Sequence, residues 1–124
     1  MKAHLIVALY MLVGLINFTP LSGVLGHDRL LQLYGVGPLD PDLALLMRHR
    51  AVLLGIVGSL LMAAAWYAPW RLAATIAGLV SMLSYIFIVW VSETDNFLLV
   101  RIMWIDVGAG LLLLAAFALH AAST

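Results

Sequence analysis

Two oppositely charged residues, Arg50 and Asp106, lie inside apolar stretches of the sequence, where an ionisable side chain is costly unless it is paired or hydrated. Asp106 follows Asn96 by ten residues, which places it about 15 Å into its helix. Arg50 follows Pro41 by nine residues, at a depth of about 13 Å on a helix that enters from the same side. We therefore predict that Arg50 and Asp106 meet at one level between two helices.

Proton transfer is the chemistry that these residues are suited to. Asp106 and His49 are the predicted catalytic residues, because a carboxylate and an imidazole can exchange protons near neutral pH. The alternative for Arg50 and Asp106 is a purely structural ion pair that links two helices. His49 also has an alternative, as an inert residue at the membrane interface. Both alternatives stay open at the level of the sequence.

Other polar residues are expected to extend this site toward a ligand. Asn17 shares one stripe of the first apolar segment with Tyr10 and Gly14, and lies toward the charged side of the molecule. Arg101 precedes Asp106 by five residues, a spacing that turns it about 140° around the helix axis, so the two should not pair directly. The predicted ligand-binding residues are Arg50, Arg101, Glu93, Asn17 and Tyr85.

The composition shows what kind of protein must position these residues. The 124 residues are 65% hydrophobic and 10% charged, with a mean hydropathy of +1.13, whereas soluble domains are about 25% charged. Crossing a hydrocarbon core takes about 20 apolar residues in a helix. We predict an all-α integral membrane protein, a four-helix transmembrane bundle. It forms a single domain over residues 1–124, with helices at about 3–19, 41–67, 70–91 and 97–119.

Residues that start or stop helices mark the boundaries. Pro20 ends or kinks the first helix, and the leucine spacing over residues 27–35 predicts a short interfacial helix in the first loop. Asp40 as N-cap and Pro41 at the first helical position predict where the second helix begins. The predicted turns between the later helices are residues 67–71 and 92–96.

Charged residues gather on one side of this bundle. Four spans place both termini and the 67–71 turn on one side and the other two connections on the opposite side. The opposite side carries Asp28, Asp40, Asp42, Glu93, Asp95, Asp106, Arg29, Arg48, Arg50 and Arg101. This cluster fits either a polar vestibule or an ordinary solvated surface. With Arg50 and Arg101 set aside as helix residues, the basic residues divide evenly, so the topology stays open.

Several functional classes find no support in the sequence. The chain has no cysteine, which excludes disulfides and thiolate chemistry. Its net charge of zero gives no electrostatic footprint for nucleic acid. No pair of histidines has metal-ligand spacing, and haem ligation by His4 and His120 is conceivable only as a pairing of two terminal residues. We therefore expect no metal, no cofactor and no nucleic-acid partner.

Small residues recur every four positions along the second predicted helix, and such seams let another helix approach closely. They are Ala51, Gly55, Ser59 and Ala63. Gly108 and Gly110 offer a similar surface on the fourth helix. The partner helix can come from the same chain or from another one, so a homodimer or a membrane-protein partner is compatible with the sequence.

Two motifs carry a resemblance to a known group of proteins. With "LYGV" at residues 33–36, "LMRHRAVLLGIVG" at residues 46–58 and four helices in 124 residues, the chain resembles small bacterial membrane proteins related to the DoxX-like families. Such proteins often carry the name phosphopantetheine adenylyltransferase, but the phosphate site of that soluble enzyme has no counterpart here. The resemblance implies an accessory membrane subunit, in some cases near quinone-linked redox chemistry.

Two functional hypotheses follow, both for a multi-pass protein of the bacterial inner membrane. In the first, an amphipathic or lipophilic molecule, such as a quinone, isoprenoid or lipid, enters from the bilayer and presents its polar head to the charged residues. Acid-base isomerisation or proton-coupled redox chemistry is the reaction that those residues could run. In the second, the protein is a non-catalytic assembly subunit whose charged side docks a membrane-protein partner.

Overall fold

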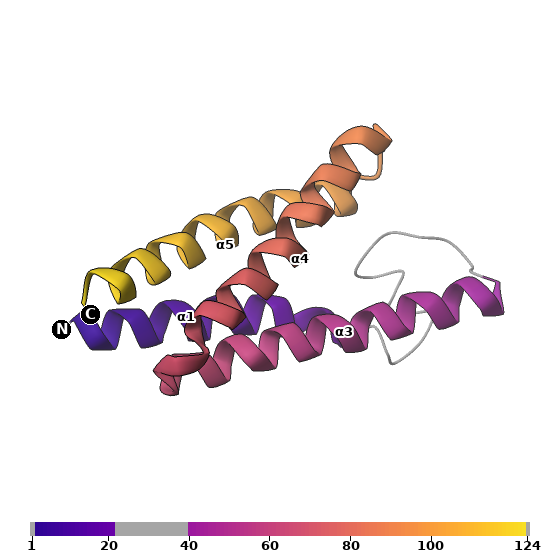
Figure 1. Ribbon diagram of the computed structural model, residues 1–124. Coiled ribbons are helices and arrows are strands. Elements are labelled where there is room, and N and C mark those ends of the chain that lie inside the picture. The colour runs from indigo at the N-terminus through magenta and orange to yellow at the C-terminus, as the bar shows by residue number, and fades with distance from the viewer. Residues whose placement is uncertain (1, 22–39, 124) are drawn as a thin grey trace.

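The computed structural model describes residues 2–21 and 40–123, and these residues form a bundle of four long helices (Figure 1). The helices are α1 (Lys2–Phe18), α3 (Pro41–Trp66), α4 (Arg71–Ser92) and α5 (Phe97–Ala122), with one short 3-10 turn, η2 (Ala68–Trp70), between α3 and α4. The four segments that contain these long helices are long and apolar enough to cross a membrane. The predicted all-α four-helix fold is confirmed, and the chain is a multi-pass membrane protein.

The helix ends lie close to the predicted ones. α3 begins at Pro41 and α5 at Phe97, as the sequence indicates. The largest difference is at the end of α5, which continues to Ala122 instead of ending at Leu119. The short helix expected over residues 27–35 lies outside the described residues.

Side-chain caps explain why α3 and α5 begin where they do. The Asp40 carboxylate accepts a hydrogen bond from the Leu43 amide at 2.7 Å, and Pro41 occupies the first turn. The Asn96 side-chain carbonyl accepts a hydrogen bond from the Leu98 amide at 3.0 Å. Each cap satisfies an amide that has no partner within its own helix. Both helices therefore start at defined points on the same side of the bundle.

Each helix has two neighbours in the bundle. α1 packs against α3 and α5, and α4 packs against the same two helices. α1 is therefore diagonally opposite α4, and α3 is diagonally opposite α5. Figure 1 shows the two termini close together at one end, while α4 and α5 lean away from α1 and α3 toward the other end. Helices that diverge in this way pack less closely at the end away from the termini.

A glycine contact brings α1 and α3 together. A methyl group at Gly58 would lie 2.6 Å from the Phe18 backbone nitrogen and 2.7 Å from the Gly14 carbonyl oxygen. The two backbones approach so closely that no larger side chain fits between them. On α3 the seam against α1 runs through Gly58 rather than through the predicted Ser59, which is exposed. Nothing lies within contact distance of a methyl group added at Gly108.

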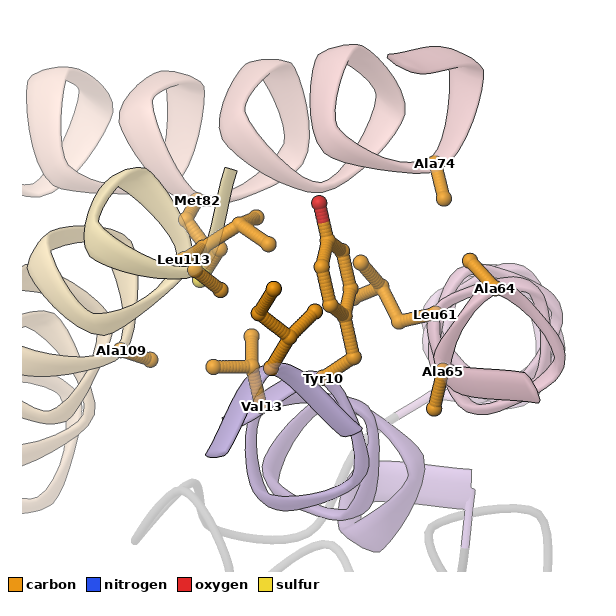
Figure 2. Packing of buried hydrophobic residues seen from close by; sticks show 11 residues of the cluster. Tyr10, Val13, Leu61, Ala64, Ala65, Ala74, Met82, Ala109 and Leu113 are labelled. Atoms are coloured by element: carbon orange, nitrogen blue, oxygen red, sulfur yellow. The ribbon is translucent and has the colours of Figure 1, made fainter. Parts of the chain in front are cut away.

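The hydrophobic core occupies the half of the bundle near the termini. Figure 2 shows Tyr10 reaching from α1 toward α4, with Val13 beside it on α1 and Leu61 of α3 alongside. All three side chains are fully buried, as is Leu113 of α5. Small residues such as Ala64 and Ala74 fill the remaining space and keep the helices close. Within the described residues, this end of the bundle therefore holds the closely packed core.

Candidate functional site

A cavity of about 510 Å³ lies in the other half of the bundle, where the helices diverge. All four long helices contribute to its wall, through side chains near the end of α1, the middle of α3, the second half of α4 and the first third of α5. Its size is in the range of small-molecule sites, which run from about 300 to 1,000 Å³. Five of the seven residues predicted as site residues line it: Asn17, Arg50, Tyr85, Arg101 and Asp106.

Arg50 and Asp106 line this cavity from diagonally opposite helices, as the depth argument predicts. The Arg50 charge interacts with the Asp106 carboxylate. Within the described residues, however, Asp106 makes neither a hydrogen bond nor a direct ion pair. Arg50 and Asp106 therefore attract each other across the cavity, without the direct contact that the sequence predicts. Asp106 is half-buried, and its oxygens stay open to the cavity instead of being sealed between helices.

Tyr85, on α4, contacts the Arg50 side chain. Its hydroxyl donates a hydrogen bond of 3.0 Å to the Leu99 carbonyl at the start of α5. The Arg50 guanidinium carbon lies 5.3 Å from the centre of the Tyr85 ring, a distance at which a cation is attracted to the face of an aromatic ring. Tyr85 therefore ties α4 to α5 and also orients a cation that belongs to α3.

Asn17 is the most deeply buried polar residue of the cavity, at 4% exposure. Its amide nitrogen donates to the Val13 carbonyl at 2.9 Å and lies 3.7 Å from the Met82 sulfur. Through these contacts, the Asn17 side chain bridges α1 and the diagonally opposite helix α4. Asn17 thus marks the floor of the cavity, where the open half of the bundle meets the packed half.

Arg101 lines the same cavity and is exposed. The sequence predicts that it does not pair with Asp106, and no ion pair joins the two within the described residues. Its side chain nevertheless contributes to the cavity wall. Arg101 has no hydrogen-bond partner among the described residues.

Two predicted site residues lie outside the cavity lining. His49 is exposed, because one residue along a helix turns the side chain about 100° away from Arg50. Glu93 is also exposed, since it ends α4 with φ of 50° and ψ of 41°, the left-handed conformation of a helix C-cap. The structure therefore does not bring His49 and Glu93 to the cavity wall with Asp106, and their predicted roles stay predictions. Charge clustering in a sequence does not report side-chain direction.

Apolar residues of the lining also belong to the outer surface of the bundle. Leu53 on α3, Ile88 on α4 and Ile105 on α5 line the cavity and are 49%, 58% and 44% exposed. In a membrane, this outer surface faces lipid tails. The cavity wall is therefore continuous with the lipid-facing surface of the protein.

A second polar cluster lies at the opposite end, and the sequence analysis did not identify it. Arg71 donates to the Ala64 carbonyl at 2.9 Å and to the Ala65 carbonyl at 2.8 Å, and it lies 3.2 Å from His120 Nδ1. Its guanidinium carbon is 5.6 Å from the Tyr10 ring centre. The position of Arg71 at the end of the 67–71 turn was the available signal. This cluster caps the last turn of α3 and joins it to α5.

Tyr10 and Thr75 extend this second cluster into the core. Their hydroxyl groups are 2.8 Å apart, and both side chains are buried. The pair spans the diagonal between α1 and α4 at the packed end. Each buried hydroxyl is thereby satisfied, which indicates a structural role.

Metal binding and similarity to known proteins add no further assignment. Within residues 2–21 and 40–123, no three histidine, aspartate or glutamate side chains converge in a way that could hold a metal ion. No family model, no curated protein and no solved structure matches this chain.

Proposed function

We propose that the protein binds an amphipathic or lipophilic molecule, such as a quinone, an isoprenoid or a lipid, in the cavity lined by Arg50 and Asp106. The observation that carries this proposal is that Arg50, Arg101 and Asp106 line one cavity whose surface is otherwise mostly apolar. Binding sites for small molecules combine apolar walls with a few convergent polar groups in this way. The two kinds of surface match the two ends of an amphiphile.

The state of the Asp106 carboxylate favours binding over a purely structural pair. A charged side chain within a membrane span costs about 2.5–3.5 kcal/mol on insertion scales. A structural ion pair would recover that cost through direct contact and hydrogen bonds. Asp106 has no such contact within the described residues, so water or a bound polar group must solvate it. A hydrated or ligand-filled cavity supplies that solvation.

The exposed apolar part of the lining supports access from the bilayer. Leu53 and Ile88 connect the cavity to the surface that faces lipid tails. A molecule dissolved in the membrane can therefore keep its tail in an apolar environment while its head moves to Arg50 and Asp106. This route suits a lipophilic ligand better than a water-soluble one.

Asp106 is the residue that could run acid-base chemistry on such a ligand. Its carboxylate is open to the cavity, so it can accept a proton from the head of a bound molecule and return it. His49 is exposed and outside the cavity lining, and has no part in this proposal. With the DoxX-like resemblance, an isomerisation or proton-coupled redox step in the bacterial inner membrane is the reaction class that we propose.

Native mass spectrometry of the protein extracted with its membrane lipids tests the binding proposal. Ser81 lines the cavity, so S81F fills it with an aromatic ring; Ala73 is exposed on the same helix and outside the lining, so A73F is the matched control. We expect a retained lipophilic molecule in the wild type and in A73F, and its loss in S81F. Equal retention in both variants would contradict the proposal. An empty cavity together with a stoichiometric membrane-protein partner would favour the assembly-subunit hypothesis.

A further inference from the structure

The Asn17 side chain is almost completely buried, yet within the described part of the chain its carbonyl oxygen accepts no hydrogen bond. The amide nitrogen donates to the Val13 carbonyl at 2.9 Å and lies 3.7 Å from the Met82 sulfur, which turns the oxygen the other way. Among the described residues, no unpartnered side-chain oxygen is sealed from water-sized molecules. Asn17 is 4% exposed and lines the cavity. Its carbonyl oxygen therefore opens into the cavity.

Asp106 presents a second acceptor to the same space. Within residues 2–21 and 40–123 its carboxylate makes neither a hydrogen bond nor a direct ion pair, and its oxygens are open to the cavity. An ionised carboxylate and an amide carbonyl only accept hydrogen bonds. Acceptors that face an apolar cavity are costly to leave unpaired once a ligand has displaced the water. A head group that fills this space must therefore bring donors.

Arg101 has the opposite requirement. It lines the cavity and has no hydrogen bond or ion pair within the described residues. Its guanidinium only donates, so a head group that contacts it needs an acceptor oxygen. A hydroxyl group donates and accepts, whereas an ether, ester or quinone oxygen only accepts and an ammonium group only donates. Because each hydroxyl group donates one hydrogen bond, Asn17 and Asp106 together call for two of them.

Building on the proposed function, we infer that the ligand is an amphiphile whose head carries at least two hydroxyl groups. One hydroxyl group donates to the Asn17 carbonyl and another to the Asp106 carboxylate, while a hydroxyl oxygen accepts from Arg101. The tail lies against the apolar wall near Leu53 and Ile88. A glycerol lipid with free hydroxyl groups and a reduced quinone share this chemistry, so both are sources to be compared.

Two pairs of probes measure the need for hydroxyl donors. Dodecylglycerol and its dimethyl ether share one tail and the same oxygen atoms, but only the first can donate. Decylubiquinol and decylubiquinone give the same contrast for a quinone. Each compound is added at equal mole fraction to the full chain in phosphatidylcholine nanodiscs without oxygen, and native mass spectrometry reads its occupancy. Phosphatidylcholine has no hydroxyl group, so the bilayer does not compete.

We expect the hydroxylated member of at least one pair to bind about tenfold better than its partner, which is the order of effect that a hydrogen bond to a charged group supplies. A ratio near one in both pairs would overturn the inference.

Variants at the two acceptors should lower this preference for different reasons. D106N puts an amide where the carboxylate stands, so an ether or quinone oxygen finds a donor there and should bind better. N17L removes the carbonyl oxygen at similar side-chain volume, so the hydroxylated compound should lose occupancy. D106N keeps the shape of the side chain, and an unchanged preference in D106N would overturn the inference even if N17L does not fold.

Two further variants separate the acceptors from general charge. R101M removes donors that both members of a pair can use, so both occupancies should fall by a similar factor and their ratio should stay the same. D42N removes an exposed carboxylate outside the cavity lining and is the matched control for D106N; it should change neither occupancy nor ratio. Loss of the preference in R101M or in D42N would contradict the assignment to Asn17 and Asp106.

The two pairs also identify the source of the head. A preference confined to the glycerol pair identifies a glycerol lipid, and one confined to the quinone pair identifies a reduced quinone. Either result, or a preference in both pairs, supports a hydroxylated head. If no probe binds above the level of S81F, the proposed function itself fails. If the members of each pair bind equally and above that level, only this inference fails.

Discussion

Arg50 on α3 and Asp106 on α5 face one cavity from diagonally opposite helices and interact across it without a direct ion pair. The other diagonal, between α1 and α4, is closed by the hydrogen bond between Tyr10 and Thr75. The bundle is therefore tight at the end near the termini and open at the end that carries the charges (Figures 1 and 2). This asymmetry is the structural basis of the proposed binding site.

The first prediction concerns the coupling of Arg50 and Asp106. R50Q leaves the Asp106 carboxylate without its countercharge, and should destabilise the protein in detergent by about 1–3 kcal/mol. Adding D106N to R50Q should recover part of that loss, because the uncompensated charge is removed. Thermal unfolding of the two single variants and the double variant measures this coupling. Additive effects would show that the two charges do not interact.

The second prediction concerns the close contact of α1 and α3. G58A places a methyl group 2.6 Å from the Phe18 backbone nitrogen, so the helices must separate, at a cost of about 1–3 kcal/mol. G108A meets nothing within contact distance and should be neutral or stabilising by up to about 1 kcal/mol. Unfolding temperatures of the two variants provide the comparison. A G58A protein as stable as G108A would contradict the described packing.

The third prediction concerns the buried hydroxyl pair. Y10F and T75V each remove one side of the hydrogen bond between Tyr10 and Thr75, and each should lower stability. Their double-mutant cycle should give a coupling energy of about 0.5–1.5 kcal/mol, the range for hydrogen bonds in membrane proteins. A coupling energy near zero would mean that the two hydroxyls do not contact each other.

The fourth prediction separates the two polar clusters. Arg71 donates to two carbonyls at the end of α3 and contacts His120, so R71Q should destabilise the bundle by about 1.5–3 kcal/mol. Because this cluster lies at the packed end, the folded R71Q protein should retain the same ligand as the wild type. Native mass spectrometry below its unfolding temperature checks this. Selective loss of ligand in folded R71Q would show that the binding site extends to Arg71.

The sequence predicted the helices well because their signals are local. Asp40 and Pro41 mark the start of α3 within a few residues, and runs of apolar residues give the helix lengths. The shared depth of Arg50 and Asp106 also followed from counting along two helices. Asn17, Tyr85 and Arg101 were predicted from polarity inside apolar segments, and the structure places all three on the cavity wall.

The sequence did not predict features that depend on side-chain direction or on packing between distant segments. The His49 side chain is turned about 100° around the helix axis from that of Arg50, so it points away from the cavity lining. Glu93 is exposed because it lies at a left-handed helix end. The contacts of Arg71 with His120 and of Tyr10 with Thr75 join residues 49 and 65 positions apart. No local pattern encodes such a pairing. The predicted ligand-binding role of the cavity residues and the DoxX-like relationship stay predictions.

Cysteine protection tests most directly whether the cavity holds an amphiphile. The chain has no cysteine, so S84C and S92C each introduce a single thiol on α4. Both serines are exposed and donate to a carbonyl of their own helix, but only Ser84 lines the cavity. The account predicts that dodecylglycerol slows alkylation of S84C by a small maleimide and leaves S92C unchanged. Equal alkylation of S84C with and without dodecylglycerol would contradict it.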